Sequence, residues 1–211
     1  GVDTVTGTAE ADTINGNGGA DVLDGDAGAD TLTGGTGADT FKFVAASDSN
    51  SVNTDTVTDF VSGTDNLTFT LDMSAQTSSV TFDATIQTAV EGKEAAENAL
   101  SGSVGQTIYD TTNSVVYVNA NANTNLSTLD YQVAVNAAAT AANTLVAGDV
   151  NFIITGGTAG DIIVAGAGDD TITGGLGADT ITGGAGADTI TGGAGADTII
   201  FGASKALNGE D

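Results

Sequence analysis

Aspartate recurs at every ninth position in two stretches of the chain, and this spacing is its first sign of chemistry. The repeating residues are Asp3, Asp12, Asp21, Asp30 and Asp39 in the first stretch, and Asp161, Asp170, Asp179, Asp188 and Asp197 in the second. Carboxylates are ligands for hard cations, and the chain has no histidine or cysteine to bind softer ones. We expect Ca²⁺ rather than Mg²⁺, because Mg²⁺ demands shorter bonds in a stricter octahedron.

The aspartates belong to nine-residue units that each combine a turn with a short strand. The first block runs from Gly7 to Lys42 and the second from Gly156 to Ile200, with typical units such as GGAGADTIT. Glycines permit the tight turn, and a Thr-Ile-Thr triplet directs only its middle residue into a core. Two units make one eighteen-residue coil, and stacked coils form two facing parallel sheets. Aspartates eighteen residues apart then lie on the same edge, about 4.8 Å from each other.

This stacking predicts the metal sites. Carboxylates so close together repel one another unless a cation lies between them. An aspartate from each of two coils, with turn carbonyls, gives about six oxygen ligands, which suits Ca²⁺. The turn glycines expected to contribute backbone are Gly35, Gly37, Gly175, Gly177, Gly184, Gly186, Gly193 and Gly195. The same-edge pairs are Asp3/Asp21, Asp12/Asp30, Asp21/Asp39, Asp161/Asp179, Asp170/Asp188 and Asp179/Asp197, which predict about six ions or more. Asp48, in phase with Asp30, is a candidate for a seventh pair.

These units resemble the RTX nonapeptide repeat, G-G-x-G-x-D-x-U-x. The resemblance implies a calcium-binding parallel β-roll at each end of the chain. The low lysine content, the lack of cysteine and the many threonines, alanines, asparagines and glycines are similar to RTX-type surface-layer proteins and large adhesins. Both classes belong to bacteria that export proteins through type I systems. The resemblance therefore implies an extracellular location on the bacterial cell surface.

The nine-residue period ends after Phe43. The segment from Asp55 to Leu67 resembles the D-x-I-x-D-F-x-x-G-x-D-x-I stretch that follows the β-roll in serralysin-type secreted proteases. Within that stretch Asp59 is a matching position, and the resemblance implies a core plug at Phe60, a turn at Gly63 and a turn or ion contact at Asp65. The protease activity is not implied, because a chain without histidine has no H-E-x-x-H motif.

We predict an all-β fold, with two calcium-binding parallel β-rolls flanking a β-rich middle region that carries one or two short helices. The segments are an N-terminal roll over 1–43, a middle region over 44–155, a C-terminal roll over 156–201 and a tail over 202–211. In the middle region, alternation predicts a strand over 79–86 and an antiparallel meander over 107–110, 114–118 and 130–135. Helix formers predict a short helix over 92–100, and an alanine-rich stretch over 137–145 predicts a second.

The composition excludes several classes of function. The chain has 28 acidic and only 3 basic residues, and its net charge is −25. It cannot neutralise a nucleic-acid backbone, and an anionic membrane surface repels it. No apolar run approaches the roughly 18 residues of a spanning helix. Because 40% of the residues are hydrophobic, the chain is expected to fold rather than to be an acidic disordered tail.

We expect no catalytic residue and no organic cofactor. The first hypothesis is a structural module of a bacterial surface layer or cell-surface protein, which folds and self-assembles on binding Ca²⁺ after type I secretion. Two alternatives stay open at this point. One is a secretion and folding domain of a larger RTX enzyme, and the other is an adhesin domain that binds surface polysaccharide.

Overall fold

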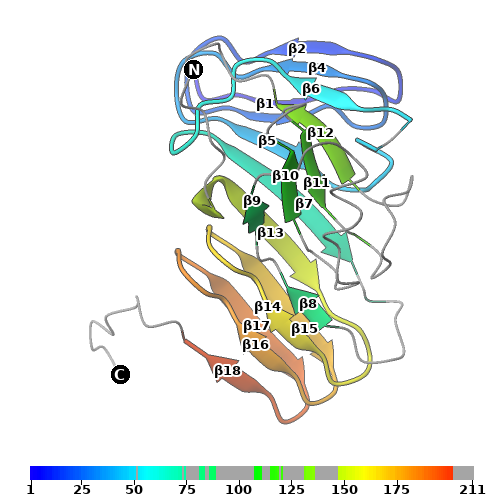
Figure 1. Ribbon diagram of the computed structural model, residues 1–211, viewed down its shortest axis with the longest axis vertical. Coiled ribbons are helices and arrows are strands. Elements are labelled where there is room, and N and C mark those ends of the chain that lie inside the picture. The colour runs from blue at the N-terminus through cyan, green and yellow to red at the C-terminus, as the bar shows by residue number, and fades with distance from the viewer. Residues whose placement is uncertain are drawn as a thin grey trace.

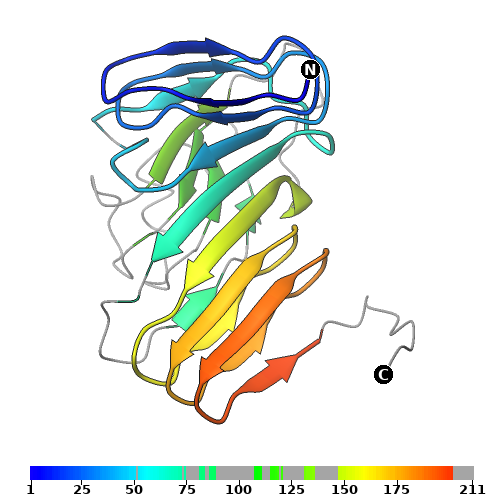
Figure 2. The same ribbon diagram turned by 180° about the vertical axis from the view of Figure 1, so that it is seen from behind.

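The computed structural model of the 211-residue chain describes residues 1–50, 52–72, 74, 81–83, 86–88, 107–110, 115–118, 120, 131–135 and 147–201. These residues form an elongated stack of β-coils. The N-terminal coils lie at one end of the long axis and the C-terminal coils lie at the other (Figure 1, Figure 2). The predicted all-β fold built from parallel β-rolls is confirmed.

One seven-stranded parallel sheet runs the length of the stack. Its strands, in spatial order, are β1 (Thr4–Thr6), β3 (Val22–Asp24), β5 (Thr40–Phe43), β7 (Asn66–Asp72), β13 (Val150–Thr155), β15 (Thr171–Leu176) and β17 (Thr189–Ala194). Within each repeat block the register is eighteen residues, as in the pairing of Thr4 with Val22 and of Thr171 with Thr189. The two-unit coil predicted from the nine-residue period is therefore present at both ends.

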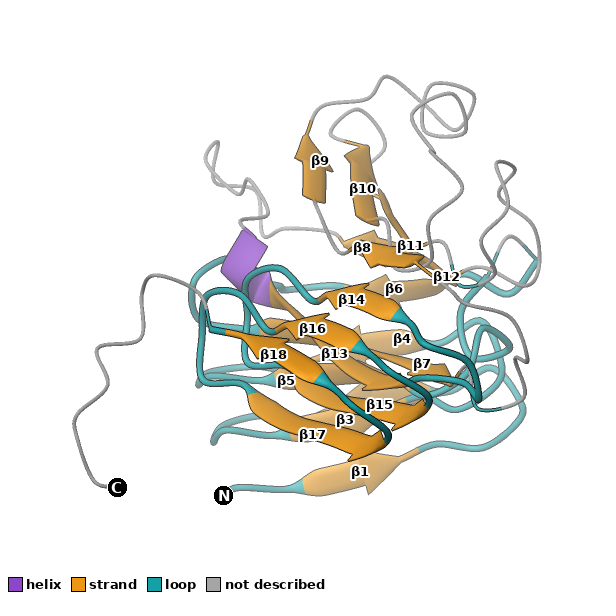
Figure 3. Ribbon diagram, turned by 90° about the horizontal axis from the view of Figure 1, so that it is seen from below, coloured by secondary structure: helices purple, strands orange, loops and turns teal. Residues whose placement is uncertain are grey.

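Two further sheets make the opposite face of the stack. The first contains β2 (Thr13–Asn15), β4 (Thr31–Thr33), β6 (Asp55–Val57), β12 (Tyr131–Val135), β11 (Val115–Val118), β10 (Thr107–Asp110) and β9 (Ile86–Thr88), in that order. The second contains β18 (Thr198–Ile200), β16 (Thr180–Thr182), β14 (Ile162–Val164) and β8 (Thr81–Asp83). In Figure 3, β14, β16 and β18 are layered over β13, β15 and β17.

The two repeat blocks belong to one continuous stack, because β7 and β13 join them within the long sheet. Leu67 of β7 pairs with Val150 of β13, although 83 residues separate the two in sequence. The middle region is thus inserted between successive strands of a single solenoid. The residue boundaries of the four predicted segments stay a prediction.

The antiparallel meander predicted for the middle region is present, because β11 pairs antiparallel with both β10 and β12. The prediction of a single strand over 79–86 is wrong, because β8 and β9 lie in different sheets, each pairing in parallel with a different neighbour. The predicted helices over 92–100 and 137–145 lie outside the described residues. Among the described residues the one helix is a 3₁₀ turn, η1 (Ala147–Asp149), and no helix there has the length and apolarity to cross a membrane.

The core of each repeat block is one side chain deep. The middle residue of each of these strands points inward, so that Leu32 and Ile181 are fully buried between two threonines, and Leu23 is fully buried between Val22 and Asp24. Such a thin core buries little apolar surface, which limits the stability it can supply. The roll itself therefore needs a second source of stabilisation.

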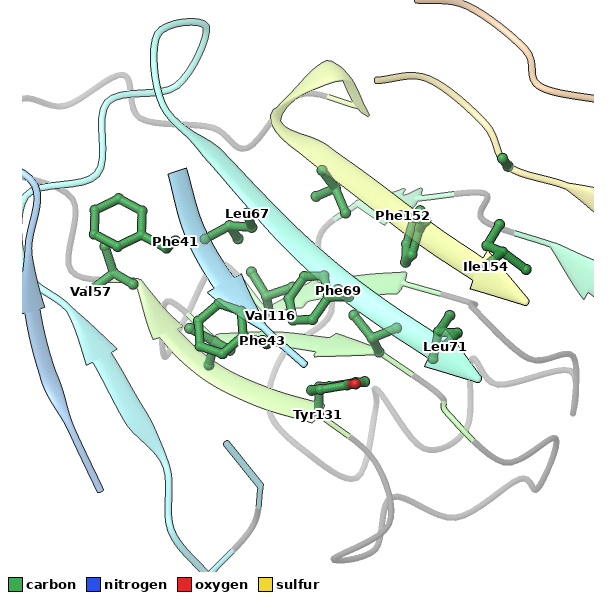
Figure 4. Packing of buried hydrophobic residues seen from close by; sticks show 14 of the residues in the cluster. Phe41, Phe43, Val57, Leu67, Phe69, Leu71, Val116, Tyr131, Phe152 and Ile154 are labelled. Carbon is green, nitrogen blue, oxygen red and sulfur yellow. The ribbon is translucent and has the colours of Figure 1, made fainter. Parts of the chain in front are cut away.

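A thicker aromatic core lies where the middle region meets the long sheet (Figure 4). Phe69 stacks on Phe43 with ring centroids 5.2 Å apart, and it meets Tyr131 edge-on at 5.1 Å. Tyr131 also donates a hydrogen bond from its hydroxyl to the carbonyl of Thr70. Phe60, the predicted core plug, is 2% exposed and packs near Phe41. This core gives the middle of the stack a conventional source of stability.

Candidate metal sites in the aspartate ladder

The structure places all six predicted aspartate pairs on neighbouring coils. In each pair the backbone N–H of the earlier residue donates to Oδ1 of the residue eighteen positions later. The distances are 2.7 Å for Asp3/Asp21, 2.8 Å for Asp12/Asp30, 2.9 Å for Asp21/Asp39, 2.8 Å for Asp161/Asp179, 3.2 Å for Asp170/Asp188 and 3.1 Å for Asp179/Asp197. We call this continuous set of contacts the aspartate ladder. In each pair the ladder contact fixes Oδ1 of the later residue and does not involve its Oδ2.

The second oxygen of several ladder aspartates is buried without a partner. Oδ2 of Asp21, Asp30, Asp170 and Asp179 accepts no hydrogen bond within the described part of the chain, and each of these residues is 1% exposed. A buried carboxylate oxygen that nothing pairs with is costly, unless a cation compensates it. These orphaned oxygens are the strongest sign in the structure that a cation belongs in the ladder.

The turns leave no space for a side chain at their glycines. A Cβ placed on Gly16 would lie 2.6 Å from Oδ2 of Asp21 and 2.7 Å from the carbonyl oxygen of Gly34 on the next coil. On Gly37 it would lie 1.5 Å from the carbonyl oxygen of Gly19. The eight predicted turn glycines all have a positive φ, between 101° and 144°. Glycine here holds a left-handed turn and keeps the space beside the carboxylate and the carbonyls empty.

Burial makes the bare carboxylates hard to ionise. Desolvation raises the pKa of Asp170 to about 7, and the negative charges of Asp188 and Asp169 add to the effect. Desolvation likewise raises the pKa of Asp30 and of Asp65. A cation at the ladder reverses this electrostatic penalty, because it favours the ionised form of every carboxylate near it.

The residues present fit a hard divalent cation with mixed ligands. No group of three or more acidic side chains gathers within the described ranges. Two carboxylates and the turn carbonyls that crowd each glycine would therefore hold an ion between neighbouring coils. An all-oxygen set with backbone carbonyls is the chemistry that Ca²⁺ prefers. That the aspartates of the ladder bind a metal ion stays a prediction.

The continuation of the ladder differs from the predicted one at Asp48. Asp30 pairs not with Asp48 but with Asp55, whose Oδ1 accepts the N–H of Asp30 at 2.8 Å. The coil here is 25 residues long, because Thr31 of β4 pairs with Thr56 of β6. Asp48 lies within the added loop, where its Oδ2 accepts the N–H groups of Val44 and Ala45, each at 2.8 Å. Its carboxylate holds the loop together instead of extending the ladder.

Asp65, the other added candidate, does lie in the ladder. Its Oδ1 accepts the N–H of Asp39 at 2.9 Å, and its Oδ2 accepts the N–H of Val61 at 2.8 Å. Both oxygens are therefore occupied by protein donors. The predicted turn at Gly63 is also present, with a φ of 76°.

Sequence reasoning missed the structural part that three aspartates play. Asp55 continues the ladder beyond the repeats, as described above. Asp59 accepts the N–H groups of Gly34 and Gly35 at 2.9 and 2.7 Å, in place of the strand carbonyl that a regular coil supplies. Asp149 of η1 accepts hydrogen bonds from Ser62 Oγ at 2.6 Å and from the N–H of Gly63 at 2.7 Å. The resemblance of the segment from Asp55 to Leu67 to a known motif could point to Asp59. Asp149 belongs to no repeat, so no sequence pattern marks it.

A comparison with protein-family models finds RTX repeats in both blocks. The family model of the RTX calcium-binding nonapeptide repeat matches residues 1–32, 155–189 and 173–204. Among solved structures, the chain is similar to the solution structure of the AlgE6R3 subunit of the Azotobacter vinelandii mannuronan C5-epimerase. The identity is 23%, the TM-score is 0.36, and the match covers 70% of this chain and 76% of that one. A comparison with curated protein sequences gave no significant match.

The family match falls on the same turns in which the structure places the ladder, the positive-φ glycines and the orphaned carboxylate oxygens. The chain therefore carries RTX calcium-binding nonapeptide repeats in both blocks, and these repeats form β-roll coils at both ends of one solenoid.

Proposed function

We propose that this chain is a structural module of a bacterial surface layer or cell-surface protein, which leaves the cell unfolded through a type I system and then folds and assembles outside on binding Ca²⁺. The observation that carries the proposal is the set of buried ladder carboxylates with unpaired Oδ2 atoms. Such a roll is poorly stable until a cation arrives. RTX repeats are typical of secreted bacterial proteins, and extracellular calcium modules bind in the range of about 10⁻⁴ to 10⁻³ M.

The two ends of the stack support the assembly part of this proposal, because they are complementary. Among the described strands, β1 and β2 are the outermost at the N-terminal end, and β17 and β18 are the outermost at the C-terminal end. All four strands pair in parallel with their neighbours, and the N–H groups of the aspartate ladder donate toward the C-terminal end. The last aspartates of the ladder at that end are Asp188 and Asp197. At the other end, Oδ1 of Asp3 and Oδ1 of Asp12 accept no hydrogen bond from the described residues.

The C-terminal edge also exposes apolar side chains. Ile199 is 37% exposed, although Ile181, its partner one coil earlier, is fully buried. Unpaired parallel strands with an open apolar end invite another strand. A second copy that docks β1 and β2 on β17 and β18 would continue both the sheets and the ladder. Such a head-to-tail contact is heterologous, so it builds chains of molecules rather than closed dimers.

Sedimentation velocity at millimolar Ca²⁺ tests this assembly. The wild-type chain is expected to associate with Ca²⁺ and to be monomeric in chelator. Ile199→Lys should abolish association, because it places a charge in the open end of the core. Ile162→Lys is the matched control, since Ile162 is 52% exposed on β14 away from the two ends of the stack. A wild-type chain that stays monomeric at millimolar Ca²⁺ and high protein concentration would overturn the proposal of self-assembly.

A further inference from the structure

Asp55 is the most completely buried of the aspartates outside the matched repeats. It is the first residue of β6, it is 0% exposed, and it lies beyond residues 1–32, where the family model matches the first block. Its Oδ1 accepts the N–H of Asp30 at 2.8 Å, and its own N–H donates to Ser49 Oγ at 2.9 Å. Its Oδ2 is buried and has no hydrogen-bond partner in the described part of the chain.

The surroundings of Asp55 are negatively charged. Asp30, one coil away, is 1% exposed and also has a buried Oδ2 with no partner. Burial raises the pKa of Asp55 to about 8, and repulsion from Asp30, Asp48 and Asp24 adds to the effect. Lys42 lies beside Asp24 at 3.9 Å, and no basic side chain in the described ranges pairs with Asp30 or Asp55. The described part of the chain therefore supplies no positive charge at this point.

Asp65 is an internal comparison for Asp55, because its Oδ1 also accepts a ladder N–H. It holds the corresponding place beside Asp39, and it also lies outside the matched repeats. There the N–H of Val61 occupies Oδ2, whereas Oδ2 of Asp55 meets no donor. The two aspartates thus hold equivalent places in the ladder, but only Asp65 has a hydrogen-bond donor for Oδ2.

We propose that Asp55 and Asp30 bind a divalent cation of the Ca²⁺ class at a site outside the nonapeptide repeats. Carboxylate oxygens in a pocket without other ligand types select a hard cation, and further ligands would come from backbone or hydroxyl oxygens nearby. The site joins the first repeat block to β6, and through β6 to the meander of the middle region. Binding there links calcium uptake by the roll to the folding of the middle region. The inference rests on the proposed calcium-dependent function.

An ion count on matched variants tests the site. Native mass spectrometry at saturating Ca²⁺ should give one ion fewer for Asp55→Asn than for the wild type, and an unchanged number for Asp65→Asn. Both substitutions keep the shape of the side chain, and both act on a ladder aspartate outside the matched repeats. An equal count for wild type and Asp55→Asn would overturn the inference. A chain that binds no Ca²⁺ at all would instead overturn the proposed function.

A second measurement covers the case in which Asp55→Asn does not fold. Anomalous scattering from calcium in crystals of the wild-type chain should give a peak beside Oδ2 of Asp55, in addition to the peaks in the glycine turns. Peaks in the turns without one beside Asp55 would reject the site and leave the function of the repeats untouched.

Discussion

The backbone N–H of Asp161 donates a hydrogen bond of 2.8 Å to Oδ1 of Asp179, which lies one coil further along the stack. Asp179 repeats the contact with Asp197 at 3.1 Å, and its Oδ2 is buried without a partner among the described residues. One carboxylate thus belongs to two successive pairs. An aspartate inside the ladder affects the coil before it and the coil after it.

Asp179→Asn should therefore weaken two calcium sites at once. Each lost site removes about 1.4 kcal/mol of stabilisation at a Ca²⁺ concentration ten times the Kd, so the loss is about 3 kcal/mol. Isothermal titration calorimetry should show fewer bound ions, and the thermal midpoint in Ca²⁺ should fall. Asp72→Asn is the control, because Asp72 is exposed at the end of β7 outside the ladder. Equal ion counts for the two variants would mean that Asp179 does not belong to two calcium sites.

Gly37→Ala should damage the turn as severely as the loss of a ligand. The added Cβ would lie 1.5 Å from the carbonyl oxygen of Gly19, at a residue whose φ is 144°. Backbone strain of this kind costs about 1–3 kcal/mol even without the collision. Chemical denaturation in saturating Ca²⁺ should show a loss of at least about 2 kcal/mol.

Gly148→Ala is the matched control for that change. Gly148 is exposed in η1, and no atom lies within 4 Å of an added Cβ. The substitution should be neutral or should stabilise the protein by up to about 1 kcal/mol, since alanine restricts the unfolded chain. Similar losses for the two variants would mean that the glycine turns do not set the stability of the roll.

Sequence periodicity predicted the ladder because every contact in it is repeated at a fixed interval. The phase of Asp21 and Asp39 determines which edge they share, and the strand register then brings them together. The same phase misled the prediction at Asp48, where a longer coil replaces the regular one. Asp55 takes the ladder position, and nothing in the spacing of the repeats marks a 25-residue coil.

The continuity of the stack could not be predicted for a different reason. β7 and β13 pair although 77 residues of chain lie between them, and Phe69 and Phe152, which are partners in this pairing, belong to no repeat. The hydrogen bonds that Asp59 accepts from the N–H groups of Gly34 and Gly35 likewise join residues far apart in sequence. Resemblance to a known motif pointed to Asp59, but only the fold shows which amide groups it binds.

The pH dependence of the folding stability should have opposite signs in the presence and in the absence of calcium. In the metal-free fold the pKa of Asp170 is about 7 and that of Asp55 is about 8, whereas an unfolded aspartate titrates near 3.8. The folded state therefore binds more protons than the unfolded chain between about pH 4 and pH 8. Its stability is highest below this window and is lost as the pH rises through the folded pKa values. In excess chelator, the far-UV circular dichroism of β-structure should grow as the pH falls from 8 to 5.

In saturating Ca²⁺ the direction is the opposite, because protons compete with the ion for the same carboxylates. Stability measured by denaturant should then fall as the pH drops from 8 to 5. If the circular dichroism in chelator does not change between pH 8 and pH 5, the buried carboxylates do not control folding in the absence of metal.

Calcium should fold the two repeat blocks cooperatively. Without the ion, ladder carboxylates repel one another, the one-residue-deep core offsets little of this, and the turn glycines are costly to order. Six sites that each add about 1.4 kcal/mol at ten times the Kd supply roughly 8 kcal/mol, which is comparable to the whole stability of a domain. We expect the rolls to be largely disordered in chelator at pH 8 and to gain β-structure as Ca²⁺ rises towards millimolar. The aromatic core around Phe69 should keep some structure throughout.

A Ca²⁺ titration followed by far-UV circular dichroism, with Mg²⁺ as the control, tests whether calcium folds the two repeat blocks. Full β signal in excess chelator would mean that the roll stands on its core alone and that the ions only decorate it.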